Sequence, residues 1–199
     1  MTEKSVHRIE NCDNFVIIVM GDKMKPIQHF KTITKHKIKV GQLCFRVKLY
    51  KQGLLHDLSK YSWTEFYTGA KYYQGTRSPN SAERDEKGYS LAWLHHKGRN
   101  KHHWEFWVDM TRKGVTAAKM PNRYILEMFC DRVAASMIYN GDSYSDQDAL
   151  AYYEGGKHSY IMHPETREVL EELLHYLADH GLDDTIRYIN EEKDLRNDN

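Results

Sequence analysis

Apolar residues recur at steps of three and four along most of the chain, which is the spacing of one face of an α-helix. The first such stripe lies between Gln28 and about Tyr50 and consists of Ile33, His36, Val40, Leu43 and Val47. Pro26 precedes it, and proline fits the first turn of a helix. The pattern therefore predicts a long first helix whose buried face carries one polar residue, His36.

Further segments repeat this pattern between short breaks. Gly53 is expected to end the first helix and to begin another turn, which three leucines between residues 54 and 58 would bury. Ser62 and Glu65 have the spacing of a capping box, which predicts that a new helix begins there. Loops are expected at 75–80 and 111–119, and helices over 82–94, 121–140, 146–154, 164–180 and 184–192.

The segment Asn14–Met20 is rich in β-branched residues and is expected to form a short strand or an extended stretch. A chain of 199 residues is long enough for one sizeable domain with a real core. The pattern therefore predicts a single all-α domain over residues 1–199, a helical bundle with a short extended N-terminal segment. Its core is expected at about 26–140, with the helices of 146–192 as packing scaffold.

The composition narrows the classes of function. Lys plus Arg number 29 and Asp plus Glu number 28, so the chain lacks the basic excess of a nucleic-acid coat. Cys12, Cys44 and Cys130 form no CxxC, which indicates reduced thiols in a cytoplasmic protein. No apolar run approaches the ~18 residues that cross a bilayer, so no membrane partner is expected. The 12 histidines are the outlier, because imidazole is a common metal ligand and acid–base group.

Several histidines and acidic residues fall among apolar neighbours. His56 and Asp57 follow an apolar run, and Asp131 lies in the stripe of the helix after Pro121. Two His-His pairs, at 95–96 and 102–103, lie between tryptophans 93 and 104. Buried His and Asp side chains are unfavourable unless they are paired or bind a metal. Such ligands suit iron, manganese, zinc, nickel or cobalt, so the sequence predicts one or two divalent transition-metal ions.

Each residue alone also has a structural interpretation. His36 could bond a backbone carbonyl in the core, and Asp131 could bond an arginine or a tyrosine. Residues 95–103 could be a basic surface loop. The metal interpretation depends on these residues converging on one point.

The run Leu54-Leu55-His56-Asp57-Leu58-Ser59-Lys60 resembles the signature of the HD-domain superfamily of helical metal-dependent phosphohydrolases, and the resemblance covers about residues 26–140. It implies that a first ion is bound by His36, His56, Asp57 and Asp131. A second ion is implied at His96 and His103, with His95 and His102 as alternates. The whole chain is also similar to an uncharacterised HD-like family that shares the run of residues 93–103.

This resemblance implies a hydrolase that acts on a nucleotide or another small phosphoester through a metal-activated water. The expected catalytic residues are Lys60, Arg99 and Glu127, the last as an acid–base group or as a group that orients a ligand. The expected substrate-binding residues are Arg77, Lys97 and Lys101. A Gly-Tyr-Pro element is missing, which excludes cyclic di-GMP as the substrate.

Two other functions fit the same residues. A di-iron oxygenase would use the same ligand set for oxygen chemistry, and would show full occupancy by iron and an absorbing mixed-valent state. A non-catalytic module that binds a nucleotide or RNA would use the loop 97–101, and its affinity would depend strongly on salt.

Overall fold

The computed structural model describes residues 24–193 and residue 195, so the expected extended segment at 14–20 and Cys12 lie outside the described residues. The chain forms an all-α fold with one small hairpin. Its α-helices are α1 (Pro26–Arg46), α2 (Tyr50–Leu55), α3 (Trp63–Lys71), α4 (Pro79–Lys87), α5 (Leu91–Lys97), α6 (Asn122–Asn140), α7 (Asp148–Gly156), α8 (Pro164–His180) and α9 (Leu182–Tyr188). Two short 3₁₀ segments matter below, η1 (Leu58–Tyr61) and η2 (Trp104–Trp107).

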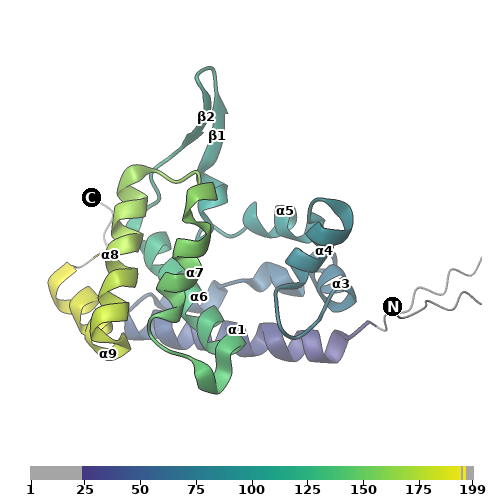
Figure 1. Ribbon diagram of the computed structural model, residues 1–199, viewed down its shortest axis with the longest axis horizontal. Coiled ribbons are helices and arrows are strands. Elements are labelled where there is room, and N and C mark those ends of the chain that lie inside the picture. The colour runs from purple at the N-terminus through teal and green to yellow at the C-terminus, as the bar shows by residue number, and fades with distance from the viewer. Residues whose placement is uncertain (1–23, 194, 196–199) are drawn as a thin grey trace, which may run out of the picture.

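Helix α6 lies at the centre of the bundle and packs against α1 on one side and α8 on the other. Its buried residues face several directions rather than one stripe, as expected for a helix covered on most sides. Figure 1 shows α1 along the base of the molecule, α3, α4 and α5 gathered at one end, and α7, α8 and α9 at the other. The site described below lies between these two ends.

The apolar stripe of α1 is buried as the sequence predicts, and its members Ile33, Val40, Leu43 and Val47 are each 7% exposed or less. The expected helix 164–180 is also confirmed, and Gly181 ends it with a φ of 81°, a conformation that suits glycine. Cys44 and Cys130 are buried and are not joined to one another.

The expected loop 111–119 is partly wrong, because residues 111 and 114–117 belong to an antiparallel hairpin. Strand β1 (Val108–Thr111) pairs with β2 (Gly114–Ala117), with Val108 opposite Ala117 and Thr111 opposite Gly114. The hairpin projects from the helical body in Figure 1. Both strands are largely exposed, so the alternation of buried and exposed side chains that would have predicted them is missing.

The interpretation of Gly53 and the following leucines was wrong. Gly53 lies inside α2, where a Cβ atom would stand 3.0 Å from the Cβ of Cys44 and from the ring of Phe45. Glycine is therefore needed for the close approach of α2 to α1. Because this face of α2 is the buried one, Leu54 and Leu55 point outward and are 63% and 54% exposed.

Candidate metal centre

Asp57 lies at the centre of the site, between α2 and η1. Its backbone has a φ of 53° and a ψ of 26°, a left-handed conformation that is uncommon for residues other than glycine and least unfavourable for Asp and Asn. The preceding residue, His56, follows the last residue of α2 with a φ of −49° and a ψ of 128°. The two side chains are thus presented by a sharp turn, rather than by the helix edge that the sequence suggested.

Helix α1 fixes this turn from below. Lys37 donates hydrogen bonds from Nζ to the backbone oxygens of Leu54, at 2.8 Å, and of His56, at 2.7 Å. These carbonyl groups belong to the C-terminal end of α2, where a cation is favourable. The neighbouring residue on α1, His36, points into the site, so one helix turn both anchors the His-Asp turn and contributes to the site.

A first group of ligand atoms comes from three separate elements. His36 of α1, the turn residues His56 and Asp57, and Asp131 of α6 each offer an atom, and these atoms all lie within 4.8 Å of one another. His36 Nε2 lies 2.8 Å from Asp131 Oδ1, and His56 Nε2 lies 3.4 Å from Asp57 Oδ2. The structure thus brings together the four residues predicted for the first ion.

A second group shares Asp57 and adds three histidines. Its members are Asp57, His96, His102 and His103, again with ligand atoms within 4.8 Å of one another. Nε2 of His96 lies 3.3 Å from Asp57 Oδ1, and Nε2 of His102 lies 3.4 Å from the same oxygen. Nε2 of His96 and Nε2 of His103 are 2.8 Å apart.

The second group contains the expected His96 and His103, and also His102, which the sequence analysis treated only as an alternate. The other alternate, His95, belongs to none of the groups found among the described residues. Its Nδ1 lies instead 2.6 Å from Glu65 Oε1. Both histidines of the second pair therefore belong to the ligand group, but only His96 of the first pair does. His95 contacts α3 instead.

Glu127 of α6 holds one histidine from each group. Its Oε1 lies 2.9 Å from Nδ1 of His56 and 3.0 Å from Nδ1 of His102. An imidazole that donates from Nδ1 to a carboxylate presents the lone pair of Nε2 to a metal. The same geometry makes His56, His102 and Glu127 a third group that could hold an ion. The orienting role suits Glu127 better, because one oxygen of its carboxylate already contacts the Nδ1 atoms of both histidines.

Glu65 of α3 plays the corresponding part for His96. Its Oε2 lies 2.8 Å from His96 Nδ1, while its Oε1 contacts His95. The spacing of Ser62 and Glu65 predicts a capping box. Helix α3 does begin after Ser62, but no side-chain hydrogen bond caps it. Glu65 is buried instead, and no spacing in the sequence distinguishes it from a capping glutamate.

The charges of the site favour metal binding. Burial alone would raise the pKa of Asp57, but the neighbouring His56, Lys60 and His96 together hold this pKa well below its usual range. For Asp131 the effect of burial is likewise outweighed, by His36 and His56. Both carboxylates therefore stay ionised, which is the form that binds a cation.

The pKa values of the histidines are shifted in different directions. Burial lowers the pKa of His103 well below its usual value, with the charges of His102 and His96 adding to this effect. Burial and the charge of Lys60 likewise lower the pKa of His36. For His56 the nearby carboxylates outweigh burial and raise the pKa. His36 and His103 are thus neutral, as metal ligands must be, whereas His56 must lose a proton.

Several atoms in the middle of the site lack hydrogen-bond partners. His56 Nε2, His102 Nε2 and Asp57 Oδ1 are buried and make no hydrogen bond with any described residue. Each such group costs about 1–3 kcal/mol when it is left unpaired. The three atoms converge on the two ligand groups, and imidazole nitrogen with carboxylate oxygen is a ligand set of divalent transition metals. The residues present therefore fit one or two metal ions.

Lys60 of η1 lies between the ligands and the solvent. Its Nζ lies 2.6 Å from Asp57 Oδ2, and the side chain is 29% exposed. Burial alone would lower the pKa of Lys60, but Asp57 and Asp131 raise it above its usual value, so the ammonium group stays charged. Lys60 thus provides a fixed positive charge beside the ligands.

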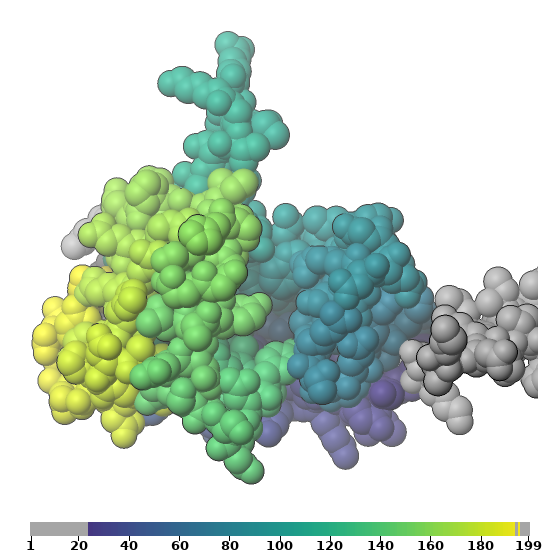
Figure 2. Space-filling model, viewed as in Figure 1, coloured from purple at the N-terminus to yellow at the C-terminus, as the bar shows by residue number. Residues whose placement is uncertain are grey.

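A cleft of about 770 Å³ opens onto the ligand groups. His36, His96, His103 and Asp131 line its floor, and Lys60 lies on its wall. Its sides are formed by residues 73–84 and 139–160, and Figure 2 shows the hollow between the blue-teal α4 region and the green α7 region. A volume of this size is within the range of small-molecule sites, roughly 300–1,000 Å³.

Besides Lys60, one of the cations that were expected to bind phosphate lines this cleft and three do not. Arg77 lines it, although its Nη1 is also paired with Asp85 Oδ2 at 2.7 Å. Among the described residues that line the cleft, Lys97, Arg99 and Lys101 are not found. Arg99 is exposed and donates from Nη1 to the backbone oxygen of His95. The expected roles of these three residues in catalysis and substrate binding stay predictions, which the lining of this cleft does not support.

Arg84 and Arg132 line the cleft and were not predicted. Arg132 follows the ligand Asp131 directly. Its guanidinium carbon lies 5.5 Å from the ring centre of Tyr153 and 5.4 Å from that of Tyr160. The position next to Asp131 is the one signal in the sequence that could have suggested Arg132.

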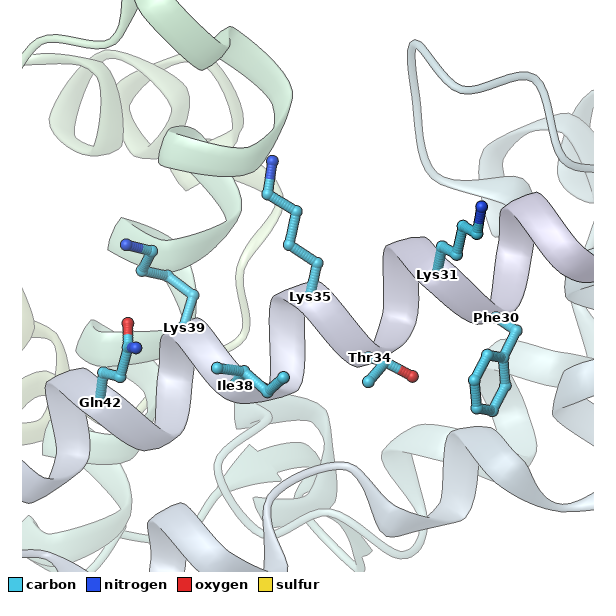
Figure 3. Close-up of a pocket in the computed structure, with 7 residues that line it drawn as sticks. All are labelled: Phe30, Lys31, Thr34, Lys35, Ile38, Lys39 and Gln42. Atoms are coloured by element: carbon cyan, nitrogen blue, oxygen red, sulfur yellow. The ribbon is translucent and has the colours of Figure 1, made fainter.

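A second hollow lies on α1 and carries no ligand group. Its lining residues all belong to this helix and are Phe30, Lys31, Thr34, Lys35, Ile38, Lys39 and Gln42. Figure 3 shows the three lysines extending from one side of the helix, with Phe30 and Ile38 on another side. This surface has no imidazole or carboxylate, so it offers no metal site.

None of the helices in the described part of the chain combines the length and the apolar character needed to span a membrane. A family model described as a family of unknown function (DUF5662) matches residues 25–176, a range that includes every residue of both ligand groups. No curated protein and no solved structure matches the chain.

Proposed function

The chain belongs to DUF5662, a family of unknown function, and we propose from its site that it is a metal-dependent phosphohydrolase acting on a nucleotide or another small phosphoester. One observation carries this proposal. Two groups of histidine and carboxylate ligands share the buried Asp57, and members of both groups line a cleft that also contains a charged lysine. Paired metal sites of this kind are suited to displacement at phosphorus. The resemblance to the HD-domain superfamily belongs to the same proposal.

The first ion would be held by His36, His56, Asp57 and Asp131. The second would be held by His96, His102, His103 and the other oxygen of Asp57. When bound, such ions polarise a phosphoryl oxygen and lower the pKa of water. Iron, manganese, zinc, nickel and cobalt all accept this ligand set.

The protein's own side chains position the substrate and balance its charge. Lys60, with its raised pKa, places a permanent positive charge next to the ligands, where negative charge grows on a phosphoryl group in the transition state. Arg77 lines the same cleft, and its guanidinium is suited to phosphate oxygens. Glu127 keeps His56 and His102 oriented, and we assign it no proton transfer.

The test is a hydrolysis panel of phosphomonoesters, phosphodiesters and nucleotides, run with each candidate metal. Wild-type protein should release product from at least one member. His103→Ala and Lys60→Met should reduce kcat/KM by at least 100-fold and by about 10–100-fold respectively, since they remove a ligand and a charge at the reacting group. His175→Ala, an exposed residue on α8, is the matched control and should leave the rate unchanged.

Hydrolysis that is equally fast in wild type and His103→Ala, with both proteins folded by circular dichroism, would exclude the site as its source. If every substrate is inert but the iron-loaded protein consumes oxygen and shows a mixed-valent absorption band, the oxygenase is the better assignment. Binding of RNA without turnover, lost as salt rises, would favour the binding module.

A further inference from the structure

The cleft extends beyond the metal ligands along a wall that the proposed mechanism does not use. This wall is formed by α5, η2, α6 and the segment after α7, and its members are Trp93, Trp104, Glu105, Arg132 and Tyr160. Trp93 connects it to the ligands, because its ring centre lies 5.4 Å from that of His96 and 4.7 Å from that of His103. A substrate whose phosphoryl group lies at the ligands would therefore place its remainder against this wall.

Glu105 is the unexplained residue of the wall. Its Oε2 is buried and makes no hydrogen bond with any described residue. Glu105 belongs to none of the ligand groups, and its carboxylate interacts with Trp93 and with the charges of Lys97 and Arg132. A buried acceptor left unpaired is unfavourable by about 1–3 kcal/mol, so it suggests a ligand that donates a hydrogen bond there.

Arg132 supplies the complementary group. Its Nε is buried and likewise lacks a hydrogen-bond partner among the described residues. The guanidinium lies over the rings of Tyr153 and Tyr160, and its charge also acts on the Glu105 carboxylate. One wall thus presents an unpaired acceptor and an unpaired donor.

Aromatic rings lie beside this pair. Trp104 and Tyr160 have ring centres 5.5 Å apart with their planes inclined at 38°. Indole and phenol rings next to hydrogen-bonding groups favour a flat ligand, because base–aromatic contacts contribute about 1–3 kcal/mol per base. The arginine also disfavours a cationic ligand at Glu105, since two positive charges would then be close together.

We propose that this wall is a nucleobase subsite. Glu105 accepts a hydrogen bond from an N–H group of the base, and Arg132 donates to an adjacent ring nitrogen or carbonyl oxygen. A nucleobase edge presents such a donor beside such an acceptor, and carboxylate and guanidinium groups read these edges in other proteins. The inference rests on the proposed function, because it assumes that the phosphoryl group of the same molecule lies at the ligands.

Two measurements on the full-length, metal-loaded protein test the subsite. The first compares kcat/KM for a nucleoside monophosphate and for ribose 5-phosphate, which lacks the base. Wild type should prefer the nucleotide by at least 10-fold. Glu105→Ala should lower kcat/KM for the nucleotide by 10–100-fold and change that for ribose 5-phosphate by less than twofold. Glu165→Gln, an exposed site on α8, is the control.

The second measurement is calorimetric binding of the four common ribonucleosides, which carry no phosphate. At least one should bind to wild type and to Glu165→Gln, and its affinity should fall at least 10-fold in Glu105→Ala. This readout does not depend on hydrolysis. It therefore tests the subsite even if no phosphoester is turned over.

The outcomes separate the two proposals. Nucleoside binding that requires Glu105, without hydrolysis of any ester, would support the subsite and overturn the phosphohydrolase. Hydrolysis without preference for a base, or an equal loss on both substrates in Glu105→Ala, would overturn the subsite and leave the phosphohydrolase standing. No nucleoside binding together with no hydrolysis would overturn both.

Discussion

Replacing Glu127 should weaken metal binding at both ligand groups, whereas replacing Glu65 should weaken it at one. The reason is geometric. One oxygen of Glu127 lies 2.9 Å from Nδ1 of His56, in the first group, and 3.0 Å from Nδ1 of His102, in the second. Glu65 reaches only His96 among the ligands, at 2.8 Å. The two glutamates therefore form a matched pair for comparison.

The expected size follows from the number of oriented ligands. Loss of a partner that orients a ligating histidine typically reduces metal affinity 10–100-fold, or about 1.4–2.7 kcal/mol. Glu127→Ala should apply this loss to both ions, which amounts to about 3–5 kcal/mol in total. Glu65→Ala should apply it once. The glutamine variants keep a neutral acceptor and should lie at the lower end of each range.

The assay is calorimetric titration of chelator-treated protein with Mn²⁺ or Co²⁺, with the two binding steps fitted separately. Glu165→Gln serves as a surface control, because this residue lies on α8 away from the site. Circular dichroism confirms that each variant is folded before titration.

An effect of Glu127→Ala on one step alone would show that His56 and His102 do not serve different ions. Unchanged affinities in both Glu127→Ala and Glu65→Ala would refute the claim that these buried glutamates orient ligands. Equal losses on both steps in Glu65→Ala would show that the two groups are not separate.

Three further predictions concern stability, and chemical denaturation of the metal-free protein measures each. Lys37→Met should lower the free energy of unfolding by about 1–3 kcal/mol, because it leaves the carbonyl groups of Leu54 and His56 without their donor; a change under 0.5 kcal/mol would refute this. Gly53→Ala should also destabilise, by about 1–3 kcal/mol, since its Cβ would stand 3.0 Å from α1; a more stable variant would contradict the close contact. Burial, with the charge of Lys60, lowers the pKa of His29 to about 4, below its unfolded value of 6.5. Neutral His29 therefore makes its full contribution to the free energy of unfolding above pH 6.5. This contribution falls by about 1.4 kcal/mol per pH unit as the pH drops from 6.5 toward 4. His29→Phe should remove this part of the slope, and identical slopes in both proteins would count against it.

The sequence predicts the parts of the fold that depend on local pattern. The stripe of α1 and the limits of α8 follow from apolar spacing, a leading proline and a terminal glycine. The break between α1 and α2 was missed because it depends on the turn at Lys48, whose φ is 62°. A lysine in the sequence does not predict a positive φ. Gly53 was read as that break because its contact with α1 is a tertiary property.

The same division holds for the site. Ligands that interrupt an apolar stripe, such as His36 and Asp131, can be predicted, because a buried polar group is unfavourable unless it is paired or binds an ion. Residues that orient a ligand or line the cleft, rather than bind the ion themselves, cannot be predicted in this way. Glu65 has the spacing of a helix cap, and Glu105 lies in a short 3₁₀ segment with no periodicity. Their roles depend on which histidine or cleft wall the folded chain brings next to them.

The cations at 97–101 show where sequence proximity is a weak guide. Lys97, Arg99 and Lys101 lie close to the histidines in the sequence, but the lining of the cleft does not include them. Lys101 extends over the rings of Phe106 and Tyr124, with its Nζ 5.7 and 5.9 Å from their centres. Charged residues in a turn therefore predict an exposed surface, but they do not predict the direction of each side chain, which depends on the fold.

The most direct measurement is the metal content of four proteins by elemental analysis after saturation and removal of free ions. Because Asp57 belongs to both ligand groups, wild type should hold two ions per chain and Asp57→Ala none. His36→Ala and His103→Ala should each hold one, since each belongs to a single group. Wild-type protein that retains no metal, or Asp57→Ala that retains as much as wild type, would contradict the shared centre on which the account depends.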